Sequence, residues 1–168
     1  MNYVKFLVVI FLFTSHLVHA SFLELSNWRA DGPISNGLWN VSEDGLSVEQ
    51  SIHSNPTFFI SEESYLNTTF TGNFGVTNNS DDDFLGFIFG FNGFNDFYLF
   101  DWKRVTQDHL GRTATEGFRL AKITNSNTAY LWDHSGNGID SLASEFGENM
   151  GWEDNVNYEV TLHYSSSN

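Results

Sequence analysis

The chain has 168 residues, of which 40% are hydrophobic and 17% aromatic, and it carries a formal net charge of −14. Enough apolar residues are present to bury the core of one domain, which excludes a disordered acidic tail. The sequence contains no cysteine, which excludes a disulfide framework. The negative charge disfavours nucleic acid and anionic membranes as partners, because both are polyanions.

The first 20 residues have the pattern of a secretory signal peptide. Lys5 supplies a positive charge, residues 6–13 (FLVVIFLF) form an unbroken apolar run, and Val18 and Ala20 suit a cleavage site. A membrane anchor or a core strand are the alternatives, but the run is well short of the ~20 residues that span a bilayer. We therefore expect a signal peptide over 1–20 and an exported domain over 21–168 that does not insert into membranes.

From residue 21 onwards the sequence favours strands over helices. Short β-branched or aromatic segments are separated by Gly, Asn, Asp and Ser, which is the pattern of an all-β sandwich. Residues 45–52 (GLSVEQSI) and 64–70 (SYLNTTF) alternate apolar and polar side chains. Each is therefore expected to be a strand with one buried and one exposed face.

Residues 84–105 are expected to form a long hairpin. Both faces of residues 84–91 (FLGFIFGF) are apolar, and a strand that is buried on both faces is typical of the centre of a sheet. Asn92-Gly93 is a turn signal. Residues 97–105 (FYLFDWKRV) then supply the second strand.

The C-terminal half predicts further strands. Residues 117–123 (GFRLAKI) and 157–164 (NYEVTLHY) alternate clearly, and residues 129–132 (AYLW) suggest a short strand. Residues 133–151 are expected to be a polar loop with a helical turn at 141–146. Either the fold closes with the last strand, or the sandwich is incomplete at the C-terminus.

Three consecutive acids, Asp81, Asp82 and Asp83, directly precede the expected hairpin. Calcium takes six to eight oxygen ligands, and a loop of consecutive aspartates supplies several from one stretch of backbone. Residues 78–80 (NNS) add neutral oxygens, and Asp101 and Asp133 are the next acids to consider. The alternative is a solvated charged turn, which the residue types by themselves favour.

The stretch DDDFLGFIFGFNGFNDFYLFDWKRVTQ, residues 81–107, closely resembles the calcium-binding C-terminal domain of thrombospondins. That family has a DDD run, an aromatic and glycine-rich strand, a turn, a second aromatic strand, Trp-Lys and a VTQ-like end in this order. Looser matches extend the resemblance over roughly residues 27–164. The calcium-rich repeats of the family do not precede the domain here, and the family continues beyond the position of His163. The pattern also resembles stand-alone domains of exported bacterial proteins.

The resemblance implies a lectin-like jelly-roll β-sandwich that binds Ca²⁺ through Asp81, Asp82 and Asp83. It also implies a secreted protein that works in adhesion or matrix binding through an unidentified extracellular protein or glycan. No enzymatic role is expected, since the sequence contains neither a G-x-S-x-G nor an H-E-x-x-H motif.

Two alternatives to an adhesion domain stay open. One is a secreted carbohydrate-binding or glycan-degrading lectin-like domain. Glycan hydrolysis needs two carboxylates about 5–10 Å apart across a cleft, and the pairs Glu145/Glu148 and Asp101/Glu116 could be imagined in that role. Their spacing does not distinguish them from other acids. The other alternative is a truncated domain with no activity of its own.

Overall fold

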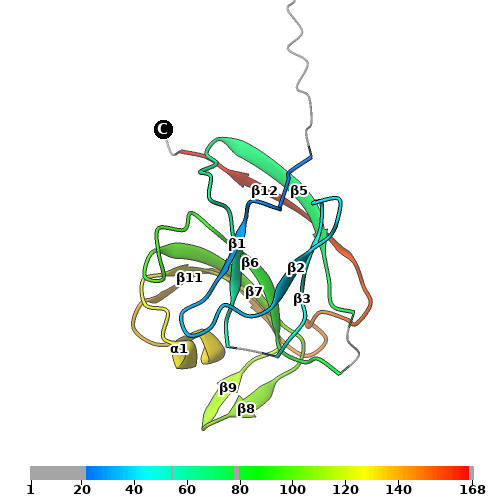
Figure 1. Cartoon of the computed structure of the whole chain (residues 1–168). Helices are drawn as coiled ribbons and strands as arrows, with labels where there is room; N and C mark the ends of the chain where they lie inside the picture. The colour runs from blue at the N-terminus through cyan, green and yellow to red at the C-terminus, as the bar shows by residue number, and fades with distance from the viewer. Residues whose placement is uncertain (1–21, 54, 78–79, 167–168) are drawn as a thin grey trace, which may run out of the picture.

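The computed structural model describes residues 22–53, 55–77 and 80–166, and strands dominate it (Figure 1). The predicted signal peptide over residues 1–20 lies outside these described residues. The strands of the described chain are β1 (Arg29–Asp31), β2 (Trp39–Val41), β3 (Val48–Gln50), β4 (Phe58–Ile60), β5 (Thr68–Phe74), β6 (Phe84–Phe89), β7 (Phe97–Lys103), β8 (Gln107–His109), β9 (Arg112–Ala114), β10 (Gly117–Ile123), β11 (Ile139–Phe146) and β12 (Tyr158–Tyr164). One helix, α1 (Thr128–Asp133), is described as well.

A four-stranded antiparallel sheet in the order β11-β10-β7-β6 forms the centre of the fold. The two-stranded sheet β12-β5 packs across one of its faces. Aromatic rings join the two layers: the ring centroids of Trp102 and Tyr158 lie 4.7 Å apart, and those of Phe74 and Phe87 lie 6.0 Å apart. The predicted all-β sandwich is therefore confirmed.

The opposite face of the central sheet contains the core. Side chains of β7 and β10 alternate strictly between buried and half-buried positions. The buried apolar ones meet a side chain of α1, and together they are Phe97, Leu99, Ala121, Ile123 and Leu131. Burying a side chain such as Phe97 completely contributes about 1.5–3 kcal/mol. Asp101, Lys103 and Arg119 occupy the same buried face further along the strands, so three charged groups also lie inside the protein.

The predicted hairpin is confirmed as β6 and β7. Its connection is closed by a hydrogen bond of 2.8 Å from the amide of Asn92 to the carbonyl of Asp96. The predicted central place of residues 84–91 is wrong, because β6 is the edge strand of its sheet. Its two apolar faces are covered from above and below by Phe74 and Trp132. Two apolar faces therefore indicate that layers cover the strand above and below. They do not indicate that the strand has a neighbour on both sides in its sheet.

Two assignments between residues 124 and 151 are wrong. Residues 129–132 lie in α1, where the side chain of Asn127 accepts a hydrogen bond from the amide of Ala129 and caps the helix. The expected helical turn at 141–146 is part of the strand β11, which pairs with β10. The side chains of β11 after Ile139 are all exposed. Pairing with a neighbouring strand, rather than local preference, therefore sets its conformation.

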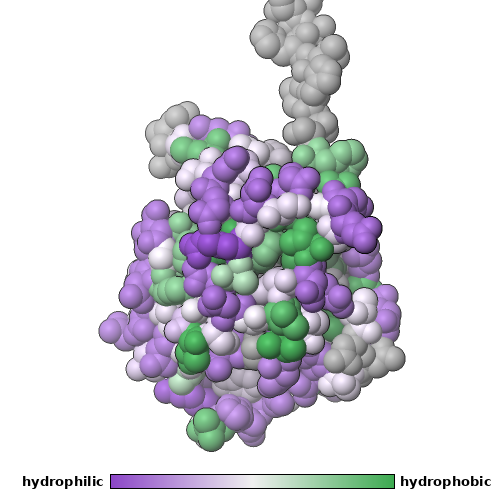
Figure 2. Space-filling view, in the orientation of Figure 1, coloured by the Kyte–Doolittle hydropathy of each residue, from purple (hydrophilic) through white to green (hydrophobic). Residues whose placement is uncertain are grey.

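The remaining predicted strands are present, one with the expected bounds and the others with shifted bounds. Residues 117–123 coincide with β10, and residues 157–164 contain β12. The pattern at 45–52 contains only the short β3, and the pattern at 64–70 overlaps β5, which starts at Thr68. The face shown in Figure 2 is mostly hydrophilic, with apolar residues in separate small groups.

Candidate metal centre

Asp81, Asp82 and Asp83 lie together in the loop that enters β6, as the sequence predicted. One carboxylate oxygen from each lies within 4.8 Å of the others. Calcium–oxygen distances of about 2.3–2.6 Å place two ligands on opposite sides of one ion about 5 Å apart. The spacing and the oxygen donors therefore fit a single hard cation. Among the described residues, no other group of three or more acids and histidines is as close together.

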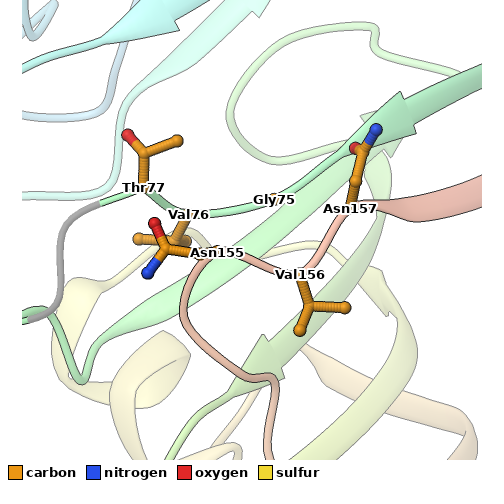
Figure 3. A pocket seen from close by; sticks show the side chains of 6 residues that line it. All are labelled: Gly75, Val76, Thr77, Asn155, Val156 and Asn157. Carbon is orange, nitrogen blue, oxygen red and sulfur yellow. The ribbon is translucent and has the colours of Figure 1, made fainter.

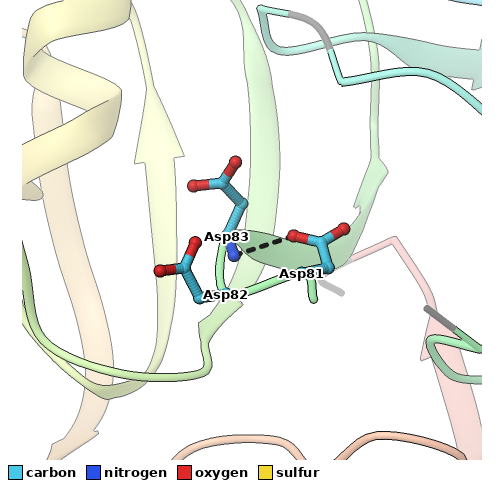
Figure 4. Close-up of side chains that lie close together, drawn as sticks. All are labelled: Asp81, Asp82 and Asp83. Carbon is cyan, nitrogen blue, oxygen red and sulfur yellow. Dashed lines mark hydrogen bonds between the residues drawn. The ribbon is translucent and has the colours of Figure 1, made fainter. Parts of the chain in front are cut away.

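A local turn brings the three carboxylates together. The amide of Asp83 donates a hydrogen bond of 3.0 Å to Oδ1 of Asp81, so the segment turns before the strand begins (Figure 4). The carboxylate of Asp82 has no hydrogen bond or ion pair with the described residues. Residues 78 and 79, which were expected to add neutral oxygens, lie outside the described part of the chain.

A lysine lies against this cluster from the inside. Lys103, at the end of β7, is completely buried. Its ammonium group donates to the main-chain carbonyl of Asp82, lies 3.4 Å from Oδ1 of Asp83 and donates a 2.8 Å bond to Oε1 of Gln107. The rings of Phe84 and Trp132 face it at 5.4 and 4.9 Å. The aspartates therefore already interact with one positive charge of the protein itself, the ammonium group of Lys103.

The electrostatics of Lys103 reflect two opposing effects. Burial lowers the pKa of its ammonium group, because removal from water disfavours the charged form. The negative charge of Asp83, and then that of Asp82, acts in the opposite direction and raises the same pKa. The aspartates thus offset part of the desolvation of the lysine.

A second cation ties the cluster to the segment before β12. The guanidinium group of Arg104 donates to the main-chain carbonyl of Asp81 and pairs with the carboxylate of Asp154. The ring of Trp152 lies under this guanidinium at 5.3 Å. Oδ1 of Asp154 is buried and has no hydrogen-bond partner among the described residues. The loop of the aspartates is therefore fixed from both β7 and the 152–154 segment.

One partner of the cluster is exposed to solvent. Nδ1 of His53 lies 3.2 Å from Oδ2 of Asp83, and the side chain of His53 is 88% exposed. The two oxygens of Asp83 thus face different side chains, with the buried Lys103 ammonium group at one and the imidazole of His53 at the other. The carboxylate of Asp82 remains the one that an added cation reaches without displacing a described partner.

The other acids that the sequence singled out lie in separate interactions. Asp133 pairs with Arg112. Asp101 is buried, and its Oδ2 lies 3.2 Å from Nη2 of Arg119 and 3.1 Å from Nε2 of His134. Neither acid joins the 81–83 cluster. Burial lowers the pKa of Arg119, and the charge of Asp101 offsets this in part.

None of the four acids considered for glycan hydrolysis lines either of the two hollows described below. Asp101 is enclosed, while Oε1 of Glu116 accepts a hydrogen bond from the amide of Gly151. Glu145 is exposed on β11. A hydrolytic pair therefore has no support in these positions.

Two open hollows lie elsewhere on the described surface. One, of about 240 Å³, is formed where the end of β5 lies beside the segment before β12 and is lined by residues 75–77 and 155–157 (Figure 3). It offers amide and hydroxyl groups and no carboxylate. The other, of about 640 Å³, includes Trp28, Tyr65, Glu62 and Glu63 in its lining. Aromatic rings beside carboxylates are suited to a polar ligand with apolar faces.

The sequence reasoning missed Lys103, Arg104 and Trp152. Trp102-Lys103 was noted only as part of the family pattern. The alternation of side chains along β7 could have indicated that Lys103 is buried, because Lys103 lies on the same face as Phe97 and Leu99. A charge on a buried face requires a partner, and the only run of three acids in the sequence is Asp81–Asp83.

These features define a β-sandwich with a cluster of three aspartates at the entry of the β6–β7 hairpin. The sequence pattern of the thrombospondin C-terminal region matches residues 35–168, and the chain belongs to that family. It is 31% identical to thrombospondin-4 of Bos taurus over 140 residues, which cover 75% of this chain and 14% of that protein. It is 29% identical to thrombospondin-2 of Gallus gallus over 137 residues, which cover 74% of this chain and 12% of that protein.

The human relative gives the same result. Thrombospondin-2 of Homo sapiens is 29% identical over 137 residues, covering 74% of this chain and 12% of that protein. The chain thus spans about one eighth of the length of the curated relatives it matches. Within the described residues, no helix has the length and apolar character needed to cross a membrane.

Proposed function

We propose that this protein is an exported, non-enzymatic, calcium-binding adhesion domain that contacts an extracellular matrix or cell-surface partner. The observation that carries the calcium assignment is the approach of the Asp81, Asp82 and Asp83 oxygens to within 4.8 Å of one another. Membership of the thrombospondin C-terminal region family supports the adhesive role. The signal-peptide pattern over residues 1–20 supports export.

The aspartates fit Ca²⁺ by their donor chemistry. Carboxylate oxygens are hard ligands of the kind that Ca²⁺ prefers. The buried ammonium group of Lys103 already lies beside them as a positive charge. Asp82 offers its carboxylate, Asp81 offers the Oδ2 that is not engaged in the turn, and Asp83 would share its carboxylate with Lys103 and His53. When bound, Ca²⁺ supplies a divalent charge that neutralises the carboxylates and links them to one another. The role of the site is therefore structural.

A structural ion stabilises the fold by mass action. An ion that binds only the folded state adds about 2.7 kcal/mol when its concentration is one hundred times its dissociation constant. The segments that benefit are those already attached to the cluster, namely the entry of β6, the end of β7 and residues 152–154. These are the supports of the central sheet. Calcium would thus hold rigid the surface that a partner recognises.

The test is a calorimetric calcium titration of the purified protein, combined with thermal unfolding in calcium and in chelator. The Asp81→Ala/Asp83→Ala variant is compared with Asp108→Ala, which removes an acid from the β8–β9 hairpin. We expect saturable binding and a higher melting temperature in calcium for the wild type and the control, and loss of both in the double variant. A wild type that folds cooperatively but ignores calcium would contradict the proposal.

A second candidate function is carbohydrate binding. The hollow that includes Trp28 and Tyr65 favours it, because aromatic rings stack on the apolar faces of sugars and Glu62 and Glu63 are at hand as hydrogen-bond acceptors. Screening the protein against immobilised glycans, with a Trp28→Ala/Tyr65→Ala variant, tests it. Glycan binding that survives Asp81→Ala/Asp83→Ala but not the aromatic variant would favour this function over a calcium-dependent one.

A further inference from the structure

The ammonium group of Lys103 lies at the inner side of the aspartate cluster. A cation bound to the aspartates would therefore be close to this positive charge. We propose that Lys103 is the internal counter-ion of Asp81–Asp83 and that it sets the calcium affinity of the cluster. It stabilises the carboxylates when no metal is bound, and it repels a divalent ion when one binds. This inference rests on the calcium-binding function proposed above.

The position of Lys103 is fixed by the sheet. Its main chain pairs with Phe84 on β6 and with Gly117 on β10, so the residue has a strand on each side. Its side chain is completely buried, and the ammonium group is enclosed by the Phe84 and Trp132 rings. The positive charge therefore stays beside the cluster whether or not a metal ion is present.

The charges of the cluster balance a divalent ion only when the lysine is counted. Three carboxylates give −3, and the Lys103 ammonium group gives +1, so the sum is −2. One Ca²⁺ ion then makes the site neutral. Without the lysine, the three carboxylates keep a net charge of −3 and attract a divalent ion more strongly. The nearby Arg104 is matched by its own partner, Asp154.

Removal of the lysine charge thus has two opposite effects. In chelator, three carboxylates lose their buried counter-ion and repel one another, so the folded state becomes less stable. In calcium, the added ion no longer meets a fixed positive charge, so binding becomes tighter. Repulsion between groups a few ångströms apart at a protein surface corresponds to about tenfold or more in affinity.

The experiment compares the calcium dissociation constant and the melting temperature in chelator for the full protein and three variants. Lys103→Met removes the charge and keeps an unbranched side chain. Lys103→Gln removes the charge but keeps a donor for the carbonyl of Asp82. Lys122→Met is the matched control, because Lys122 also lies on a strand of the central sheet, pairs with an aspartate, Asp96, and faces the ring of Tyr98.

We expect both Lys103 variants to bind Ca²⁺ about tenfold more tightly than the wild type and to melt several degrees lower in chelator. The Lys122→Met control should keep the wild-type affinity. If Lys103→Met is too unstable in chelator, Lys103→Gln still gives both readouts. Binding that appears only in the Lys103 variants would overturn the calcium function of the wild-type protein, although it would support an effect of the lysine charge on the affinity of the cluster.

The outcomes separate the two proposals. Clear wild-type calcium binding with unchanged or weaker affinity in Lys103→Gln overturns the counter-ion role and leaves the calcium function intact. Equal melting temperatures of the wild type and the Lys103 variants in chelator also overturn it. Absence of binding in every variant overturns the calcium function, and the affinity-setting role fails with it. Failure of both Lys103 variants to fold even in calcium would make the lysine a folding determinant and would also overturn the inference.

Discussion

The indole Nε1 of Trp152 donates a hydrogen bond of 3.1 Å to the main-chain carbonyl of Asp83, which lies 69 positions earlier in the sequence. Trp152 is almost completely buried, and the guanidinium group of Arg104 covers its ring. The aspartate loop is therefore anchored by a residue close to the last strand. Disturbing this single bond should affect the metal site and the fold together.

The first prediction concerns Trp152→Phe. The variant removes the indole donor, so the carbonyl of Asp83 keeps only the long 3.4 Å bond from the amide of Arg104, and the smaller ring leaves a void. We expect a loss of about 1–2 kcal/mol in the free energy of unfolding, measured by urea denaturation. Trp28→Phe is the control, since the ring of Trp28 stacks on Phe59 near the N-terminus of the described chain. Equal losses in the two variants would argue against the role of the hydrogen bond.

The second prediction concerns the buried charges behind the central sheet. Asp101 shares its Oδ2 with Arg119 and His134, and all three side chains are buried. Asp101→Asn leaves the guanidinium group of Arg119 without its directly paired carboxylate inside the protein, so we expect a loss of about 3–5 kcal/mol. Denaturation by urea, followed by near-UV circular dichroism, measures it. The exposed Asp108→Asn should lose less than about 1 kcal/mol, and a similar small loss for Asp101→Asn would contradict the argument.

The third prediction concerns the pH dependence of the hairpin turn. Hydrogen bonds from Lys122, and then from Asn92, lower the pKa of Asp96 below its ordinary value of 3.8. A depressed folded-state pKa contributes stability that is present above the unfolded value and lost as the pH falls through the folded value. Asp96→Asn should therefore be less stable than the wild type at neutral pH.

The difference between these two proteins should close in acid. Below the folded pKa of Asp96 the carboxyl group is protonated in the wild type, and it then resembles the amide of the variant. Urea denaturation of both proteins over a series of pH values, from neutral to below 3.8, measures the gap. A gap that stays constant across this series would show that Asp96 contributes no charge-dependent stability.

The fourth prediction compares two glycines in strands. Gly117 has a φ of +118°, and an added Cβ would lie 2.2 Å from the carbonyl oxygen of Glu145. Gly117→Ala should therefore strain the β10–β11 pairing and cost at least about 1–3 kcal/mol. Gly72 in β5 has open space around it, so Gly72→Ala should be close to neutral. Thermal unfolding of both variants measures the difference, and a stable Gly117→Ala would show that β11 shifts freely.

Much of the fold could be predicted because strands leave a local signal. The period of two at 117–123 and 157–164 and the turn at Asn92-Gly93 located β10, β12 and the central hairpin. Residues 129–132 and 141–146 were misassigned. In the first case the side chain of Asn127 caps a helix of six residues, and in the second an exposed segment takes the strand conformation of its neighbour β10. Neither cause is visible in hydrophobic periodicity.

The sequence by itself determined that an acidic run stands directly before an aromatic hairpin, because three consecutive aspartates need no tertiary contact to be adjacent. It also carried the pattern that assigns the chain to its family. Only the tertiary structure decided what faces those acids. Lys103, Arg104 and Trp152 reach Asp81–Asp83 from 20 to 69 positions away. Such distant contacts depend on the register of β6 against β7 and on the course of the chain before β12, and both are set by the packing of the two layers.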